Sequence, residues 1–266
     1  MGEQVTLFQV GDEVYYSGSL IRSGANSEFH LVDERLVAKK PLSFNMAQAA
    51  ALPLTAITAY EALFDRMAIP FQRDPAGQAI LIIGGAGGVG SLAIQLAKIA
   101  KLHVIATASR IETQSWCRKM GADEVIDHTQ SIPEQLEHVH RPMVEYILNT
   151  SQTDQHWGAM CMVIKPQGRI CGIVDTTESI DLNALKSKSA TFVWEFMFTR
   201  SMYQTDDMIA QHHLLKRIAE WVDGQQIQST LTETLSPIHA THLRKAHAKL
   251  ESGRMIGKLV LTGWDF

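Results

Sequence analysis

Residues Gly85 to Gly90 read GAGGVG, which has the spacing G-x-G-x-x-G between the apolar run "AILII" and the apolar-periodic segment "SLAIQLAKIA". Such a motif, directly after a strand and opening a helix, binds the pyrophosphate of a dinucleotide. The first glycine allows a tight turn, the second lets the backbone approach the phosphates, and the third lets helix and strand pack closely. The first N–H groups of the helix add hydrogen-bond donors and positive potential. The spacing therefore predicts a dinucleotide site at this junction.

The next strand indicates which dinucleotide would bind. This strand, "HVIATASR", ends at Ser109 and Arg110 and carries no acidic residue. An NAD site usually has Asp or Glu there to bind the ribose 2′-hydroxyl. A carboxylate would repel a 2′-phosphate, whereas a hydroxyl and a guanidinium can bind it with charge-assisted hydrogen bonds. The strand end therefore favours NADPH.

Apolar strands and amphipathic helices alternate around these two segments. Strands are expected at 79–83, 103–108, 124–126, 144–148, 169–174 and 191–198, and helices at 91–101, 112–120, near 155–164 and at 181–185. This β-α-β rhythm is typical of a parallel sheet covered on both faces. It predicts an α/β fold with a doubly wound parallel sheet, the Rossmann architecture.

The two flanking regions have a different pattern. The first forty residues contain short alternating runs such as "VGDEVYYSG" and are expected to be β-rich. Residues 45–67 predict a helix, a kink at Pro53 and a second helix. After Thr205 a helix ending at Gly224, a strand at 229–235, a helix at 239–250 and a strand at 258–262 are expected. We therefore predict a nucleotide-binding domain at 45–205 and a smaller β-rich domain made of 1–44 and 206–266.

Composition excludes several classes of protein. The chain has 266 residues, a net charge of −4 and 45% hydrophobic residues, so it can bury a large core and lacks the basic excess of a nucleic-acid binder. It has neither a run of about 18 apolar residues nor the start of a signal peptide. The odd set Cys117, Cys161 and Cys171 has no metal-like spacing, so reduced thiols in a cytoplasmic protein are expected.

The histidines do not form a readable metal motif. His212-His213 and His239-x-x-His242 are the tightest groups, but no Cys or Glu joins them at ligand spacing. His239 and His242 lie near an expected helix start, where solvated or capping histidines are common. We therefore expect no stoichiometric zinc.

The segment "ATFVWEFMF" is expected to be the last strand of the sheet. Strand alternation turns Glu195 away from the side of Trp194 and Phe196, toward solvent, a helix or a partner subunit. An exposed apolar edge strand needs covering, and a two-fold partner can cover it. The segment therefore predicts a homodimer.

Six segments carry a family resemblance: "VTLFQVGDEVYYSG", "AAALPLTAITAYEAL", "GGAGGVGSLAIQLAK", "VIATASRIETQSWCRKMGADEVIDH", "FVWEFMFTRSMYQTDDM" and "ESGRMIGKLVL". They span nearly the whole chain and resemble the medium-chain dehydrogenase/reductase superfamily on its quinone-oxidoreductase side, in the subgroup of zinc-type alcohol dehydrogenase-like proteins. The resemblance implies a Rossmann domain with a partial GroES-like catalytic domain.

The resemblance also implies roles for individual residues. Thr58 would lie by the nicotinamide, Ser109 and Arg110 at the 2′-phosphate, and Lys258 would reach the phosphates from the other domain. The strand-end segments 149–150 and 172–174 would line the adenosine and nicotinamide sides. The expected cofactor-binding residues are Thr58, Gly85, Gly87, Gly88, Val89, Gly90, Ser109, Arg110, Asn149, Gly172, Ile173 and Lys258. No catalytic acid can be named.

The chain departs from the family at its start. In relatives "VTLFQVGDEV" lies well inside the first domain, so much of the N-terminal half of the catalytic domain is expected to be missing here. Loss of that half is expected to impair turnover more than cofactor binding. Without zinc, quinones and α,β-unsaturated carbonyls suit hydride transfer better than simple alcohols. The leading hypothesis is an NADPH-dependent reductase of such compounds; the alternatives are a non-catalytic NADPH-binding protein and a zinc-type alcohol dehydrogenase.

Overall fold

The computed structural model describes residues 1–22, 24, 26–71 and 77–264. The chain divides into two compact units, one made of Met1–Ile57 with Phe196–Phe266 and the other of Thr58–Glu195. We call the first the flanking unit and the second the sheet unit. The first boundary falls inside helix α2 (Pro53–Tyr60). The domain boundaries expected from the sequence, at 44/45 and 205/206, stay a prediction.

The sheet unit contains six parallel strands in the order β5-β4-β3-β6-β7-β8. Their bounds are β3 (Ala79–Ile83), β4 (His103–Thr107), β5 (Glu124–Ile126), β6 (Val144–Asn149), β7 (Ile164–Gly172) and β8 (Thr191–Trp194). The order reverses between β3 and β6. In doubly wound sheets, ligands bind outside the carboxyl ends of the strands at such a reversal. The expected fold class is confirmed.

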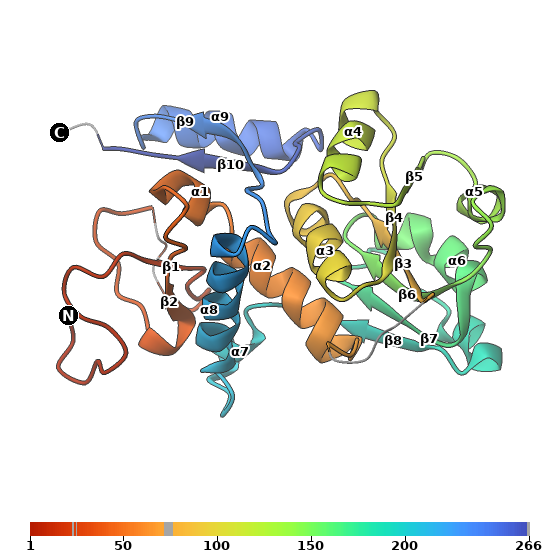
Figure 1. Cartoon of the computed structure of the whole chain (residues 1–266), viewed down its shortest axis with the longest axis horizontal. Coiled ribbons are helices and arrows are strands. Elements are labelled where there is room, and N and C mark those ends of the chain that lie inside the picture. Colours follow the sequence, from red (N-terminus) through yellow and green to blue (C-terminus); the bar gives the residue numbers. More distant parts are fainter. Residues whose placement is uncertain (23, 25, 72–76, 265–266) are drawn as a thin grey trace. The chain divides into compact units, whose positions relative to one another are not determined.

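Helices cover both faces of this sheet (Figure 1). Helices α3 (Gly88–Ile99) and α4 (Ile111–Lys119) lie on one face, and α5 (Ile132–His138) and α6 (Thr153–Val163) on the other. Leu81 of β3 is fully buried in a core cluster with Leu136 of α5 and Met160 of α6. Every residue of β3 is buried, as expected for a strand covered on both faces. The short helix α5 was not expected from the sequence, and the element near 181–185 is a 3₁₀-helix, η3 (Leu182–Lys188).

Two elements of the sheet unit differ from their expected form. The strand expected at 191–198 is shorter and ends at Trp194. The N–H of Glu195 still donates to the Gly172 carbonyl (3.0 Å), and the chain then turns at residues 197–198. The second expected helix continues past α2 as a π-helix, η2 (Glu61–Arg66). Its i→i+5 pattern is seen in the 3.0 Å bond from the Met67 N–H to the Ala62 carbonyl. Single π-helical turns inside helices are rare and often mark functional sites.

The flanking unit has two small sheets and several helices (Figure 1). Strands β1 (Val14–Tyr16) and β2 (Val37–Lys39) pair antiparallel, and β9 (Leu231–Leu235) and β10 (Lys258–Leu261) pair parallel. The helical elements are η1 (Glu34–Leu36), α1 (Met46–Ala50), α7 (Thr199–Tyr203), α8 (Ala210–Asp223) and α9 (Ala240–Glu251). The break between α1 and α2 matches the expected kink, because Pro53 is the first residue of α2.

The first forty residues are less β-rich than expected. Their described part contains only β1 and β2, three residues each. Phe29 and Leu31, in the alternating run "EFHLVDERLVAKK", are 84% and 76% exposed. With no apolar face to bury there, the alternating pattern does not lead to a longer ladder.

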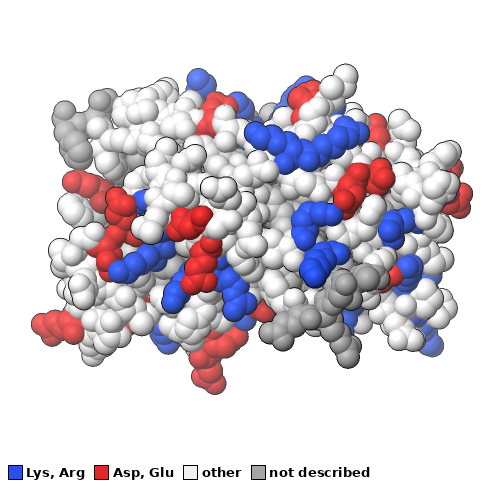
Figure 2. Space-filling view, viewed as in Figure 1, with Lys and Arg blue, Asp and Glu red and all other residues white. Residues whose placement is uncertain are grey.

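Charge is mixed on the surface. Figure 2 shows basic and acidic side chains interspersed on the face drawn, some of them side by side. None of the helices in the described ranges is long and apolar enough to span a bilayer.

Candidate functional site

The glycine segment forms a turn between β3 and α3. Gly84 has a φ of +84°, the left-handed region that favours glycine. Its N–H donates to the Thr107 hydroxyl (3.1 Å), and the Gly85 N–H donates to the Thr107 carbonyl (3.1 Å). Gly87 then occupies the N-cap of α3 in extended geometry, without a side-chain cap. The first N–H groups of α3 thus have no capping side chain and can bind an anion.

The three motif glycines differ in what a side chain would meet. A Cβ on Gly90 would lie 2.3 Å from the Gly84 carbonyl oxygen, and one on Gly85 would lie 2.8 Å from the Ala106 Cβ. These two glycines are required for packing, as the motif predicts. A Cβ on Gly87 would come no closer than 3.5 Å to other protein atoms. Its small size therefore leaves room beside the turn, which fits the close approach of a pyrophosphate.

Arg110 lies where β4 passes into α4. Its N–H donates to the Thr113 hydroxyl (3.1 Å), which in turn donates to the Arg110 carbonyl (2.7 Å). The Arg110 Nη1 lies 3.1 Å from the Glu112 Oε1. Ser109 and Arg110 are half-buried. The two hydrogen bonds with Thr113 hold the backbone of Arg110, while its side chain is partly exposed to solvent. Sequence reasoning missed Glu112, a carboxylate that competes with any anion for Arg110.

The ends of β3, β6 and β7 are linked by hydrogen bonds. The Thr150 hydroxyl donates to the Ile83 carbonyl (2.8 Å), and the Ile173 N–H donates to the Asn149 carbonyl (3.2 Å). The Asn149 amide donates to the Thr153 hydroxyl (2.9 Å), which donates to the Val174 carbonyl (2.6 Å). These bonds hold the carboxyl ends of three neighbouring strands in fixed relative positions.

The structure brings most of the expected cofactor residues to one edge. The carboxyl ends of β4, β3, β6 and β7, which are neighbours in the sheet, carry Gly85, Gly87, Gly88, Val89, Gly90, Ser109, Arg110, Asn149, Gly172 and Ile173. Thr58 is buried near the end of α2, in the sheet unit. Lys258 is the first residue of β10, in the flanking unit, and burial lowers its pKa. The roles assigned to these residues stay predictions.

The described residues do not form a metal-binding set. Within those ranges, no three His, Cys, Asp or Glu side chains come together in a way that could hold a metal ion. His239 caps α9 instead, accepting from the His242 N–H (3.2 Å), which confirms the capping alternative. Cys117, Cys161 and Cys171 are free and buried, and burial raises the pKa of Cys117 to about 12. Zinc does not fit the described residues, and we derive no step through it.

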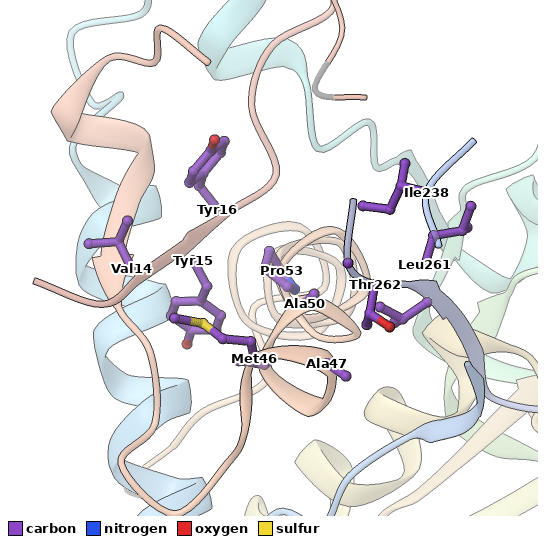
Figure 3. A pocket seen from close by; sticks show the side chains of 13 residues that line it. Val14, Tyr15, Tyr16, Met46, Ala47, Ala50, Pro53, Ile238, Leu261 and Thr262 are labelled. Carbon is purple, nitrogen blue, oxygen red and sulfur yellow. The ribbon is translucent and has the colours of Figure 1, made fainter. Parts of the chain in front are cut away.

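The flanking unit contains an apolar pocket of about 360 Å³ (Figure 3). It is lined by residues of β1, α1, the start of α2 and β10, with Tyr15, Met46, Pro53 and Leu261 among them. The Tyr15 hydroxyl donates to the Leu215 carbonyl (2.6 Å), and burial raises the pKa of Tyr15. The described residues that line this pocket include no Asp, Glu, His, Lys, Arg or Cys.

Sequence reasoning missed two features of the sheet unit. Gly84 starts the turn, and its signal was a glycine directly after the buried strand. The second feature is the contact of Arg66 with Glu195 (2.8 Å), which joins residues 129 positions apart. No local pattern connects these two residues.

Comparisons with known proteins identify the family of the chain. The zinc-binding dehydrogenase family model matches residues 120–261. A zinc-type alcohol dehydrogenase-like protein from Staphylococcus epidermidis is 47% identical over 265 residues, 98% of this chain and 78% of the relative.

Two solved structures extend the match to the fold. The crystal structure of a putative zinc-dependent alcohol dehydrogenase from Rhizobium etli has a TM-score of 0.95 at 47% identity, over 100% of this chain and 78% of that one. The quinone oxidoreductase of Pseudomonas syringae has a TM-score of 0.81 at 26% identity, over 98% of this chain and 78% of that one. The chain thus belongs to the zinc-type alcohol dehydrogenase-like family of the medium-chain dehydrogenase/reductase superfamily, an oxidoreductase family that uses pyridine nucleotides.

Proposed function

We propose that this protein is an NADPH-dependent reductase of quinones, enones or related carbonyl compounds. The observation that carries the proposal is the uncapped glycine turn beside a strand end that bears Ser109 and Arg110. The turn fits a pyrophosphate, because Gly87 leaves space and the start of α3 provides N–H donors. The strand end carries no acidic residue to bind a ribose 2′-hydroxyl.

Preference for NADPH rests on the charges at this strand end. A 2′-phosphate can take a charge-assisted hydrogen bond from the Arg110 guanidinium, for which Glu112 now competes at 3.1 Å. An exposed ion pair of this kind contributes about 0.2–1 kcal/mol, so a phosphate with two negative charges can displace it. Arg110 therefore favours NADPH, and Glu112 reduces the size of that preference.

The remaining roles follow from the resemblance. Thr58, Gly172 and Ile173 would contact the nicotinamide end, and Asn149 the adenosine side. Lys258 would contribute positive charge at the phosphates. When bound, the cofactor supplies a hydride, while the protein provides orientation and a dry surrounding.

The acceptor class follows from how the carbonyl would be polarised. Among the described residues, no three His, Cys, Asp or Glu side chains come together to hold a metal ion, so hydrogen bonds would polarise the carbonyl. In quinones and enones, conjugation spreads the charge that develops on hydride transfer, so hydrogen bonds can stabilise it. The quinone oxidoreductase among the similar structures supports the same class.

Binding and turnover should be tested separately. We would titrate NADPH and NADH by following the nicotinamide fluorescence, and then measure NADPH oxidation with a panel of quinones and enones. Tighter binding of NADPH with turnover of at least one acceptor supports the proposal. Equal dissociation constants for the two cofactors contradict the NADPH preference, and binding without turnover favours a non-catalytic NADPH-binding protein.

Two further expectations belong to the proposal. A homodimer would cover β8, which is the last strand of the described sheet. Trp194 and Phe196 are 45% and 49% exposed beside this edge and would be buried by a partner. A cytoplasmic location stays a prediction.

A further inference from the structure

Two carboxylates and one guanidinium meet inside the sheet unit. The Arg66 Nε lies 2.8 Å from the Glu195 Oε2, and the Arg66 Nη2 lies 3.9 Å from the Glu61 Oε2. Both glutamate side chains are 0% exposed, whereas that of Arg66 is 31% exposed. The π-helix η2 brings its first and last residues together, because its hydrogen bonds run from i to i+5.

This cluster has more negative than positive charge. A buried charge is costly unless it is paired, and one guanidinium cannot neutralise two carboxylates. Burial and the neighbouring Glu61 carboxyl raise the pKa of Glu195 to about 8, against the opposing effect of Arg66. The pair of carboxyls therefore shares one proton at neutral pH, and its titration belongs to the pair. Two titratable or charged groups of β7 face this segment. One is the Cys171 thiol, whose pKa is raised by burial and by Glu195, and the other is Arg169, whose Nη1 donates to the Met67 carbonyl (3.1 Å) directly after η2.

The cluster lies beside a strand end that belongs to the proposed site. Helix η2 packs against β7 and β8. The Glu195 N–H donates to the Gly172 carbonyl (3.0 Å), and Trp194 is paired with Gly172 in the ladder. Thr58 precedes Glu61 by three positions, about one helical turn. Gly172 and Thr58 are both expected to contact the nicotinamide. Gly172 is thus hydrogen-bonded to the backbone of Glu195, and Thr58 lies one helical turn before Glu61.

We propose that Glu61, Arg66 and Glu195 form a proton-holding clamp that positions the nicotinamide-binding end of the site, a proposal that rests on the proposed function. With its proton, the clamp holds the end of β8 against η2, and so holds Gly172 and Thr58 in place. Without that proton, two carboxylates repel each other around one guanidinium, and the end of β8 loosens. The three are positioning residues, since neither glutamate side chain reaches the surface.

The direction of the pH effect follows from the raised pKa of Glu195. In the unfolded chain this group loses its proton near its ordinary pKa, about 4.3, well below the folded value. The stability that the bound proton provides is therefore complete below about pH 4.3 and is lost as the pH rises through about 8. Cofactor binding at the nicotinamide end should weaken over the upper part of the same interval.

The test compares NADPH with 2′,5′-ADP, a fragment that has the 2′-phosphate but no nicotinamide. Both dissociation constants are measured from pH 6.5 to 9.5 for the wild type, Glu195→Gln and Glu61→Gln. Glutamine mimics a permanently protonated carboxyl and can still accept from Arg66. Glu137→Gln, on the exposed side of α5, is the matched control.

We expect NADPH binding by the wild type to weaken about fivefold or more over this range relative to 2′,5′-ADP, a difference of about 1 kcal/mol. Glu195→Gln should remove that difference, and Glu137→Gln should keep it. The wild-type melting temperature should also fall by about 3–6 °C more than that of Glu195→Gln between pH 6 and 9. If Glu195→Gln does not fold, Glu61→Gln provides the same comparison.

Two results would overturn the clamp. One is a parallel pH dependence for NADPH and 2′,5′-ADP in the wild type. The other is an unchanged pH dependence of melting in both glutamine variants. If neither ligand binds at any pH, the proposed function fails, and the melting curves alone decide whether the buried pair holds a proton.

Discussion

Two places at the carboxyl ends of the strands in the sheet unit are built in opposite ways: the turn between β3 and α3, and the contact between η2 and the end of β8. At the β3–α3 junction, residues within seven positions form a turn from backbone and small side chains, with N–H groups at the start of α3 left for a ligand. Where η2 packs against the end of β8, charged side chains 129 positions apart meet, and both glutamate side chains are fully buried while that of Arg66 is 31% exposed. The first arrangement provides affinity for phosphate through the backbone. The second provides no contact for a ligand and can act only by fixing where neighbouring strands end.

This contrast predicts two kinds of mutational effect, one on the affinity for the phosphates of a ligand and one on the positioning of its nicotinamide. Changes at the glycine turn and at Arg110 should act on all ligands that carry the corresponding phosphates. Changes at the acid pair should act on the nicotinamide part alone and should depend on pH. The following predictions test the first half of that comparison and the expected cover of the β8 edge.

Gly90→Val should have the largest effect. A Cβ at this position would lie 2.3 Å from the Gly84 carbonyl oxygen, so α3 has to move away from the end of β3. We expect the free energy of unfolding to fall by about 3 kcal/mol and NADPH binding to be lost. Chemical denaturation followed by circular dichroism measures the first effect, and fluorescence titration the second.

Gly158→Ala is the control for that change. Gly158 lies in α6, and no atom lies within 4 Å of its added Cβ. Alanine is the better helix former there by about 0.5–1 kcal/mol, so this variant should be slightly more stable and should bind NADPH normally. Equal destabilisation by both substitutions would contradict the packing role of Gly90.

Arg110→Ala should weaken NADPH binding about tenfold or more, because a charge-assisted hydrogen bond contributes about 1.5–3 kcal/mol. NADH binding should change little, since NADH has no 2′-phosphate. Arg118→Ala, on the exposed side of α4, is the charge-matched control and should leave the ratio of the two dissociation constants unchanged. An Arg110→Ala variant that keeps the wild-type ratio would exclude Arg110 from the 2′-phosphate site.

Phe196→Lys should weaken self-association by about tenfold, because a charge would be buried at the apolar edge. Light scattering over a range of protein concentrations measures the dimer dissociation constant. Tyr203→Lys, at a position 74% exposed, is the control. A wild-type protein that stays monomeric at every concentration would rule out the expected homodimer.

Glu112→Gln should have the smallest effect and the opposite sign. Removing the carboxylate 3.1 Å from Arg110 frees the guanidinium for a phosphate. NADPH should bind up to about fivefold more tightly, in line with the 0.2–1 kcal/mol of an exposed ion pair, and NADH should be unaffected. Weaker NADPH binding by this variant would show that Glu112 orients Arg110 rather than competing for it.

Much of the sheet unit could be predicted from the sequence, for a local reason. Apolar runs such as "AILII" indicate strands, and the helical spacing of apolar residues after Gly90 indicates a helix. The reason is that burial of one or both faces of an element fixes the spacing of its apolar residues along the chain. The glycines were readable because a tight turn and a close helix–strand contact admit no larger residue. The position of Ser109 and Arg110 followed from the end of the second strand.

Other features depended on tertiary contacts. Strand alternation around Glu195 allowed its side chain to face solvent, a helix or a partner subunit. Only the fold showed that this side chain is buried against Arg66. Strand β8 is shorter than the apolar run predicts, because the chain turns at residues 197–198. The π-helical form of η2 brings Glu61 and Arg66 together although neither residue has an unusual local propensity.

The sequence by itself thus determined the strand–helix alternation, the glycine turn and the absence of an acid at the second strand end. Tertiary structure decided that Glu195 meets Glu61 and Arg66, and that the side chain of Glu195 is buried there. The physical reason is that backbone constraints and burial periods act over a few neighbouring residues. The charge state of a buried carboxyl depends instead on groups that the fold brings from far along the chain.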